Sequence, residues 1–239
     1  TLDPHMHVNT PEYNILGHIF DHLTEIDNDM NIVPWLAKSW KCESDQVTWT
    51  FYLHKDVKFH NGYELTADDV KFSIERMLNP QQKSPQAYKL RPVKEVKVLD
   101  PHTVQIITKE PFPTLLGELR TVEIMSRRIV KEMGSEVAKH PIGSGPFKFI
   151  RWERDDRVEL EAASGHHTLK PKTRRLIFRI IPEVSTRVAE LRAGAIDIIK
   201  NVPPSEIKTL EQNPDIRISR SRSLRVLYVG FRHDREPFN

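Results

Sequence analysis

The segment from Thr48 to Pro80 changes its hydrophobic period once, and this change constrains the fold more than any other feature of the sequence. Apolar and polar side chains alternate from Val47 to Leu53, which is typical of a half-buried strand. Asn61-Gly62 then supplies a turn, and Thr66 with Asp69 three positions later forms a helix-capping pattern. A strand, a turn and then a capped helix predict a mixed α/β protein.

Helical and strand patterns alternate through the rest of the chain, without internal repeats. Thr10 as a hydroxyl N-cap before Pro11, with apolar residues at helical spacing after it, predicts a helix that begins at Thr10. A hairpin is expected around Asp100-Pro101-His102. Pro141 to Pro146 is the densest Pro/Gly cluster, so it is the best position for a domain boundary. Further helices are predicted at residues 114–119, 127–133 and 185–193, and further strands at 147–150, 158–162, 176–181, 196–199, 216–218 and 224–231.

Composition indicates a soluble globular chain. Hydrophobic residues make up 38% and charged residues 29% of the 239, which excludes a disordered tail, and no apolar run approaches the ~20 residues of a membrane-spanning helix. The 36 Lys and Arg are nearly matched by 33 Asp and Glu and are scattered, so no nucleic-acid partner is indicated. The length allows two domains.

No motif indicates catalysis or a cofactor. Gly143-Ser144-Gly145 lacks the Lys and the following helix of a phosphate-binding loop, and the single cysteine, Cys42, allows no cysteine-based metal site. His5 and His7 would face one side of an extended segment and could hold a metal, although an ordinary polar loop is the favoured interpretation. His166-His167 is expected to lie in a solvated loop, and His54 and His60 at an exposed strand edge.

Several segments in order resemble one family across nearly the whole chain. They are Thr1 to His5 (similar to "LDP"), Pro34 to Trp40, Thr48 to Pro80, Val104 to Pro113 ("TVxxxLxxPxP"), Pro141 to Phe147 ("PIGTGPY"), Glu183 to Asp197 ("STRVAALxxGEID") and Tyr228 to Asn239 ("YxGFNxxxxPFxD"). The chain is therefore identified as resembling the extracytoplasmic solute-binding proteins of family 5, the dipeptide-, oligopeptide- and nickel-binding components of ABC importers. It departs at Ala195, where the family has an acid.

This resemblance implies a lobe of the periplasmic binding protein type II kind. Residues 1–21 with 143–239 would form domain I around a mixed sheet, and residues 22–142 an inserted, smaller α+β domain II. The family chain is about twice as long, so a second lobe is expected after Asn239. A sheet edge left open where the family has an earlier strand would favour self-association of this lobe.

The resemblance also implies a ligand site. In the peptide-binding relatives the segment after "LDPH" pairs with the peptide backbone like an added strand. Arg120 is a candidate anion contact from domain II, although an ordinary surface arginine is the favoured interpretation. His7 falls, with Tyr13, near cleft positions of the nickel-binding relatives. The residues implied as ligand-binding are Val8, Asn9, Thr10, Tyr13, Tyr88, Arg120 and Tyr228.

The function implied is capture of a peptide or similar small polar solute between two lobes for delivery to the transmembrane subunits of an ABC permease, without catalysis. A nickel or metallophore carrier is the alternative, and a secreted hydrolase a distant one. The expected location is the periplasm, or the cell surface as a lipoprotein in a Gram-positive organism. The signal sequence and any lipid anchor would lie outside this chain.

Overall fold

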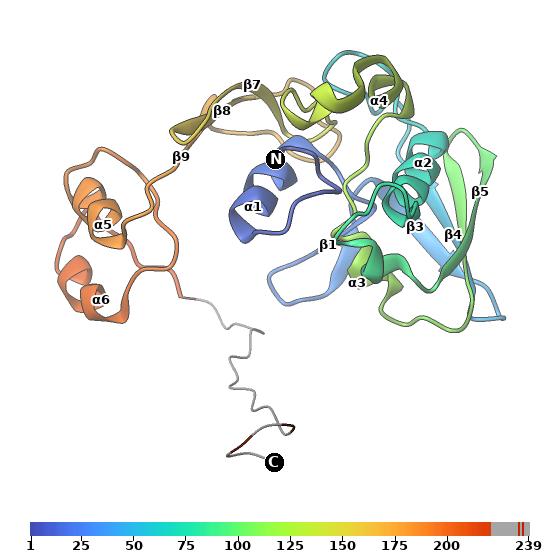
Figure 1. The fold of residues 1–239 in the computed structure, drawn as a ribbon, viewed down its shortest axis with the longest axis horizontal. Helices are drawn as coiled ribbons and strands as arrows, with labels where there is room; N and C mark the ends of the chain where they lie inside the picture. The colour runs from blue at the N-terminus through green and yellow to red at the C-terminus, as the bar shows by residue number, and fades with distance from the viewer. Residues whose placement is uncertain (221–233, 235, 237–239) are drawn as a thin grey trace. The chain divides into compact units, whose positions relative to one another are not determined.

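The structure is a computed structural model that describes residues 1–220, 234 and 236. The chain divides into two compact units, Thr1–Ile180 and Ile181–Asn239. In chain order the first unit contains α1 (Thr10–Ile19), β1 (Thr24–Ile26), β2 (Ile32–Pro34), β3 (Ala37–Cys42), β4 (Thr48–Leu53), α2 (Ala67–Leu78), the 3₁₀ helix η1 (Ala87–Leu90), β5 (Val93–Asp100), β6 (Thr103–Thr108), α3 (Leu115–Leu119), α4 (Arg127–Met133), the 3₁₀ helix η2 (Gly134–Ala138), β7 (Phe147–Glu153), β8 (Arg157–Ala162) and β9 (Arg175–Arg179) (Figure 1).

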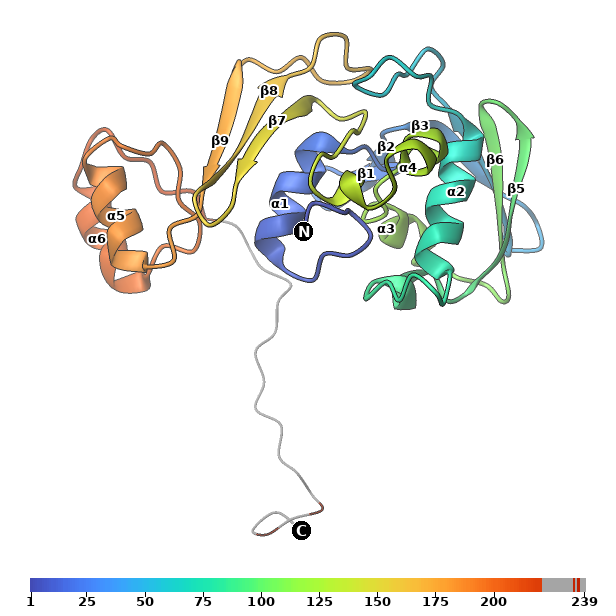
Figure 2. The ribbon, with the colours of Figure 1, turned by 45° about the horizontal axis from the view of Figure 1, so that its top comes forward.

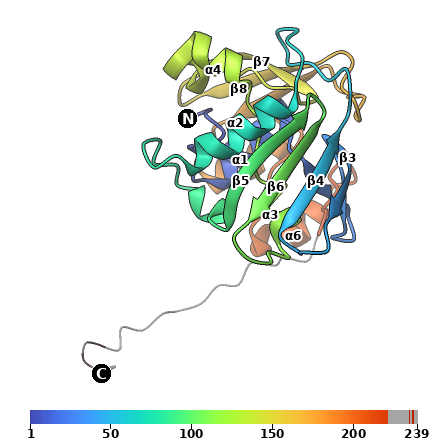
Figure 3. The same cartoon turned by 90° about the vertical axis from the view of Figure 1, so that its right-hand side faces the viewer.

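A four-stranded antiparallel sheet with the order β3-β4-β6-β5 forms one part of the first unit. Helix α2 packs on β5 and β6 and covers one face of the sheet (Figure 3). Its inward stripe includes Val70 and Ile74, which are fully buried with Phe51 of β4. The capping pattern is confirmed, because Thr66 and Asp69 form a reciprocal capping box. The predicted hairpin is also confirmed, with β5 paired to β6.

The strands β7, β8 and β9 form a separate antiparallel sheet, and α1 packs against β7 (Figure 2). Helix α1 begins at Thr10 as predicted, but its N-cap is Asn9 and not Thr10, with Glu12 completing the capping box. The short strands β1 and β2 pair with each other. Neither β1 nor β2 was predicted, since three-residue strands carry too little alternation to detect. The six-residue strand β3 was not predicted either.

The Pro/Gly cluster at residues 141–146 packs closely against the end of α1. The amide of Gly145 donates to the Ile19 carbonyl at 2.8 Å, and the amide of His60 donates to the Gly143 carbonyl at 2.8 Å. A Cβ added at Gly143 would lie 2.0 Å from the Ile19 carbonyl oxygen, so the close approach requires glycine there. The predicted domain I resumes at residue 143, within this cluster. The division of the chain into domains I and II stays a prediction.

The second unit contains α5 (Val184–Arg192) and α6 (Pro204–Glu211), joined by an ion pair of 3.0 Å between Arg192 and Glu206. The strands predicted at 196–199 and 216–218 are wrong, because neither segment pairs with another strand among the described residues of this unit. Residues 224–231 lie outside the described part. In the part of the chain that the structure describes, none of the helices is both long and apolar enough to cross a bilayer.

Candidate functional site

A hollow of about 360 Å³ opens in the first unit, where three segments that are distant in the sequence meet. They are the approach to α1, the η1 turn and the residues that follow α3. We call this hollow the α1–η1 pocket. Its lining residues are His7, Val8, Asn9, Thr10, Tyr13, Pro85, Gln86, Tyr88, Lys89, Arg120 and Thr121.

The α1–η1 pocket brings together six of the residues implied by the family resemblance: Val8, Asn9, Thr10, Tyr13, Tyr88 and Arg120. Val8 and Tyr88 are 71% and 61% exposed, so two apolar side chains stand open to solvent on its walls. Tyr228 lies outside the described residues. Nothing in the structure tests a ligand contact of any of these residues, so their binding role stays a proposal.

The segment from Val8 to Thr10 is not an extended edge. Thr10 is the first residue of α1, and the amides of Val8 and Asn9 donate to Glu12 Oε2 at 3.2 and 3.3 Å. Because these two N–H groups are already bonded, they do not supply the ladder that an added strand requires. In this structure the segment is a capped helix start, and its strand-like pairing with a ligand backbone stays a prediction.

At the back of the pocket, the side chains of His7 and Glu123 form a buried pair with no hydrogen bond between them. His7 Nε2 lies 3.8 Å from Glu123 Oε1, both side chains are almost fully buried, and neither ring nitrogen of His7 has a hydrogen-bond partner. Gln86 fastens the same segment by donating to the carbonyls of Pro4 and His7. Buried polar atoms without hydrogen-bond partners lower the stability of the folded chain. A polar ligand group that entered the pocket and bonded these atoms would remove this penalty.

His5 is excluded from metal binding by its own contacts. Its Nδ1 accepts from Arg76 at 3.0 Å and its Nε2 donates to the Glu123 carbonyl at 2.9 Å, so both ring nitrogens are used. Burial, and then the charge of Arg76, lower the pKa of His5 and keep the ring neutral. Residues 4–6 form a turn, so His5 and His7 do not share the face of an extended segment.

Two cations line the pocket, and one of them had no signal in the sequence. Lys89 Nζ donates to Gln86 Oε1 at 2.7 Å and to Thr121 Oγ1 at 2.9 Å. Arg120 Nη1 lies 3.4 Å from the Tyr13 hydroxyl oxygen and 3.9 Å from Glu25 Oε1. Lys89, Gln86 and Thr121 were missed because lysines, glutamines and threonines are common on any surface, and only the folded η1 turn brings them together.

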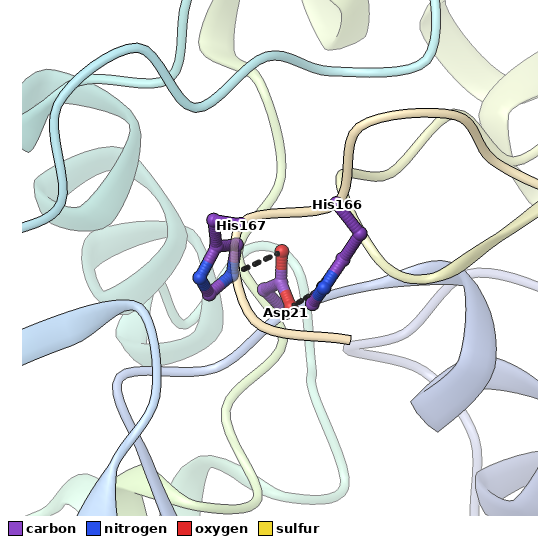
Figure 4. Close-up of side chains that lie close together, drawn as sticks. All are labelled: Asp21, His166 and His167. Carbon is purple, nitrogen blue, oxygen red and sulfur yellow. Dashed lines mark hydrogen bonds and ion pairs between the residues drawn. The ribbon is translucent and has the colours of Figure 1, made fainter. Parts of the chain in front are cut away.

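A second cluster surrounds Asp21 (Figure 4), and its residues do not line the α1–η1 pocket. His166 Nε2 lies 3.1 Å from Asp21 Oδ1, and His167 Nε2 lies 3.4 Å from Asp21 Oδ2. Trp35 and Ser144 also donate to this carboxylate, at 2.7 and 2.8 Å. The two imidazoles are buried, so the expectation that they are solvated is wrong, and so it is for His60, whose Nε2 bonds the Gly145 carbonyl.

The Asp21 cluster has the composition of a metal site, since its three ligand atoms lie within 4.8 Å of one another. The tautomer of His166 argues against this use. Its Nδ1 accepts from the amides of Thr168 and Leu169 at 3.2 and 2.8 Å, which places the proton on Nε2, where it donates to Asp21. A metal at Nε2 would have to displace that proton, so the cluster is better described as a hydrogen-bonded junction.

Burial alone would raise the pKa of the Asp21 carboxyl. The hydrogen bond from His166 and the proximity of His167 outweigh burial and hold the pKa well below its usual range. Asp21 is therefore a buried, ionised centre that ties the end of α1 to the loop between β8 and β9.

Solved structures with this fold are periplasmic binding proteins. The peptide-bound DppA of Helicobacter pylori, described as an ABC transporter-associated periplasmic binding protein, aligns with a TM-score of 0.81 and 30% identity over 89% of this chain and 46% of its own. NikZ of Campylobacter jejuni, in complex with Ni(L-His), aligns with a TM-score of 0.82 and 31% identity over 89% of this chain and 43% of its own. The fold is therefore that of part of a periplasmic binding protein.

The chain belongs to the bacterial extracellular solute-binding proteins, family 5, whose model matches residues 31–239. Among curated relatives, the glutathione-binding protein GsiB of Pectobacterium atrosepticum is 28% identical over 242 residues, covering 100% of this chain and 47% of the relative. The chain spans about half the length of the curated relatives it matches. The family consists of transport binding proteins.

Proposed function

We propose that this chain forms one lobe of the solute-binding component of an ABC transporter, and that the α1–η1 pocket holds part of a peptide or similar small polar solute. The observation that carries the proposal is the convergence of six residues, implied by the family resemblance, on one hollow. Exposed Tyr88 and Val8 offer apolar contact, while the polar and charged side chains of the pocket offer hydrogen bonds.

The remaining assignments follow from the same proposal. Residues 1–21 with 143–239 form domain I and residues 22–142 form domain II, with the ligand enclosed when a second lobe closes over the pocket. The transmembrane subunits of an ABC permease are the partner, and the location is the periplasm or the outer face of a Gram-positive cell. The protein catalyses no reaction on its solute. An open sheet edge in the isolated lobe would support its self-association.

A nickel or metallophore carrier is the second candidate, and His7 is the observation that favours it. Both ring nitrogens of His7 lack a hydrogen-bond partner at the back of the pocket, and Glu123 offers a carboxylate oxygen 3.8 Å away. NikZ, with a similar fold, binds Ni(L-His). A chelated metal could complete its coordination at His7, whereas His5 has no free nitrogen.

Calorimetry on the full-length, two-lobe protein tests these proposals. Short peptides such as trialanine, glutathione and Ni(L-His) would be titrated separately into the protein and into its Tyr88→Ala and His7→Gln variants. Peptide heat that weakens in Tyr88→Ala supports the peptide function. Heat with Ni(L-His) alone, lost in His7→Gln, supports the metal carrier, and no heat with any of the three contradicts both.

A further inference from the structure

Lys89 brings a positive charge into the wall of the α1–η1 pocket without a carboxylate partner. Its two hydrogen bonds go to neutral oxygens, those of Gln86 and Thr121. Among the described residues, no carboxylate oxygen lies within 4.0 Å of its ammonium, and Glu123 and Glu118 act on it only at longer range. Burial lowers the pKa of Lys89, which shows that the folded chain disfavours its charge.

A second cation, Arg120, lines the same pocket as Lys89. The charge of Arg120 lowers the pKa of Lys89 further, against the larger opposite effects of Glu123 and Glu118. Arg120 itself is only loosely compensated, with Glu25 Oε1 at 3.9 Å and the Tyr13 hydroxyl at 3.4 Å. None of the residues that line the pocket is an aspartate or a glutamate. The pocket wall therefore carries two cations and no carboxylate, and the carboxylates of Glu25, Glu118 and Glu123 that act on these cations lie outside the lining.

The unused donors are of the kind that binds an oxyanion. An ammonium has three N–H groups, and the two contacts of Lys89 leave the third for a ligand. A guanidinium has five N–H groups, and the contacts of Arg120 with Tyr13 and Glu25 are both made by its Nη1. An anion between the two side chains would accept from both and would remove their repulsion. A ligand ammonium at this position would instead add a third positive charge.

We infer that the α1–η1 pocket receives a carboxylate of the bound solute between Lys89 and Arg120. This inference rests on the proposed function and adds the ligand chemistry that the fold alone leaves open. Lys89 is then a specificity-determining residue, because a peptide whose carboxylate lies here is distinguished from the same peptide as an amide. The solute class is a small peptide or amino-acid derivative with a free carboxylate.

Paired probes separate this role from a structural one. Trialanine and N-acetyl-trialanine, each as the free acid and as the C-terminal amide, are titrated by calorimetry into the full-length, two-lobe protein. Replacing the carboxylate by an amide is expected to weaken binding by about tenfold or more, the size of one charge-assisted hydrogen bond. Blocking the amino group leaves this pocket's contribution unchanged, so the preference for acid over amide persists between N-acetylated forms.

The Lys89→Gln variant gives the second arm, because glutamine retains a donor while losing the charge. The preference for acid over amide is expected to fall by about tenfold in Lys89→Gln, and the coupling between the two changes isolates the Lys89 contribution. Lys94→Gln, at an exposed position on β5, is the matched control and keeps the full preference. If Lys89→Gln fails to fold, Arg120→Gln makes the same test.

Two results would overturn the inference while leaving the proposed function in place. One is equal affinity for trialanine and its amide. The other is a preference for the acid that persists in both Lys89→Gln and Arg120→Gln, since the carboxylate would then be bound elsewhere. If none of the peptides binds, the peptide function itself is contradicted, and the inference falls with it.

Discussion

Asp21 and His166 are separated by 145 positions in the sequence, yet their Oδ1 and Nε2 atoms lie 3.1 Å apart with both side chains fully buried. Asp21 lies between the end of α1 and the start of β1, and His166 belongs to the loop between β8 and β9. Ser144 of the Pro/Gly cluster and Trp35 bond the same carboxylate. One ionised group thus joins four segments of the first unit.

Replacing Asp21 by asparagine should destabilise the protein by about 3 kcal/mol, the size expected for breaking a buried charged hydrogen-bonded group. The asparagine NH₂ would face groups that are themselves donors, the N–H of Trp35 and His166 or the hydroxyl of Ser144. Urea unfolding followed by circular dichroism measures the change. Asp29→Asn, at an exposed position, should stay within ~0.5 kcal/mol of wild type, and an equal effect of both variants would refute the role of Asp21.

Acidification should destabilise the protein from near neutral pH downwards. Burial is the main cause that lowers the pKa of His5 and His60, so the unfolded chain binds protons before the folded one as the pH falls below about 6.5. Asp21, with its depressed pKa, adds a loss that begins below about pH 4, where the unfolded carboxyl takes up its proton. The protonation of His5, His60 and Asp21 therefore lowers the free energy of unfolding in each case as the pH falls.

Unfolding free energies at pH 7.5, 6.5, 5.5 and 4.5 check this expectation. His60→Gln should show a shallower loss between pH 6.5 and 4.5, because a glutamine amide can still donate to the Gly145 carbonyl but does not titrate. His140→Gln, at an exposed position, should follow the wild-type curve. A protein that is equally stable at pH 7.5 and 5.5 would contradict the assignment.

The local elements of the fold were predictable because their signals are local. The alternation at β4, the capping box of α2 and the β5–β6 hairpin each depend on residues within a few positions of one another. The expected strands at 196–199 and 216–218 failed for the opposite reason. A strand needs a partner, and apolar composition does not show whether one exists.

The pocket could be predicted only in part. Six lining residues came from the family resemblance, whereas Lys89 and Thr121 carry no local pattern and are joined only by a hydrogen bond across 32 positions. His166 and His167 were misjudged because the sequence around them is polar, and a contact across 145 positions leaves no trace in composition. Long-range polar pairing is the information that a single sequence lacks.

Gly143 should tolerate no side chain. In Gly143→Ala the new Cβ would lie 2.0 Å from the Ile19 carbonyl oxygen and 2.9 Å from the Phe20 ring, so α1 or the glycine segment must move. We expect a loss of at least ~3 kcal/mol in urea unfolding. Gly117→Ala is the matched control, since nothing lies within 4 Å of that Cβ and helix α3 should gain about 0.5–1 kcal/mol.

Tyr88 should contribute to binding far more than to folding. Its side chain is 61% exposed on the pocket wall, so its truncation removes apolar contact with a ligand without leaving a cavity in the core. In the full-length protein, Tyr88→Ala should weaken the binding of trialanine by about 5- to 10-fold, the loss expected for one aromatic contact. Its unfolding free energy should stay within ~0.5 kcal/mol of wild type.

Tyr52→Ala is the control for this prediction. Tyr52 is also partly exposed, at 38%, but it lies on β4 and does not line the pocket. Its truncation should leave peptide affinity unchanged, whatever it does to the stability of the sheet. If both tyrosine variants bind trialanine as the wild type does, the α1–η1 pocket is not where the peptide lies. A selective loss in Tyr88→Ala would place the ligand against η1, within reach of Lys89.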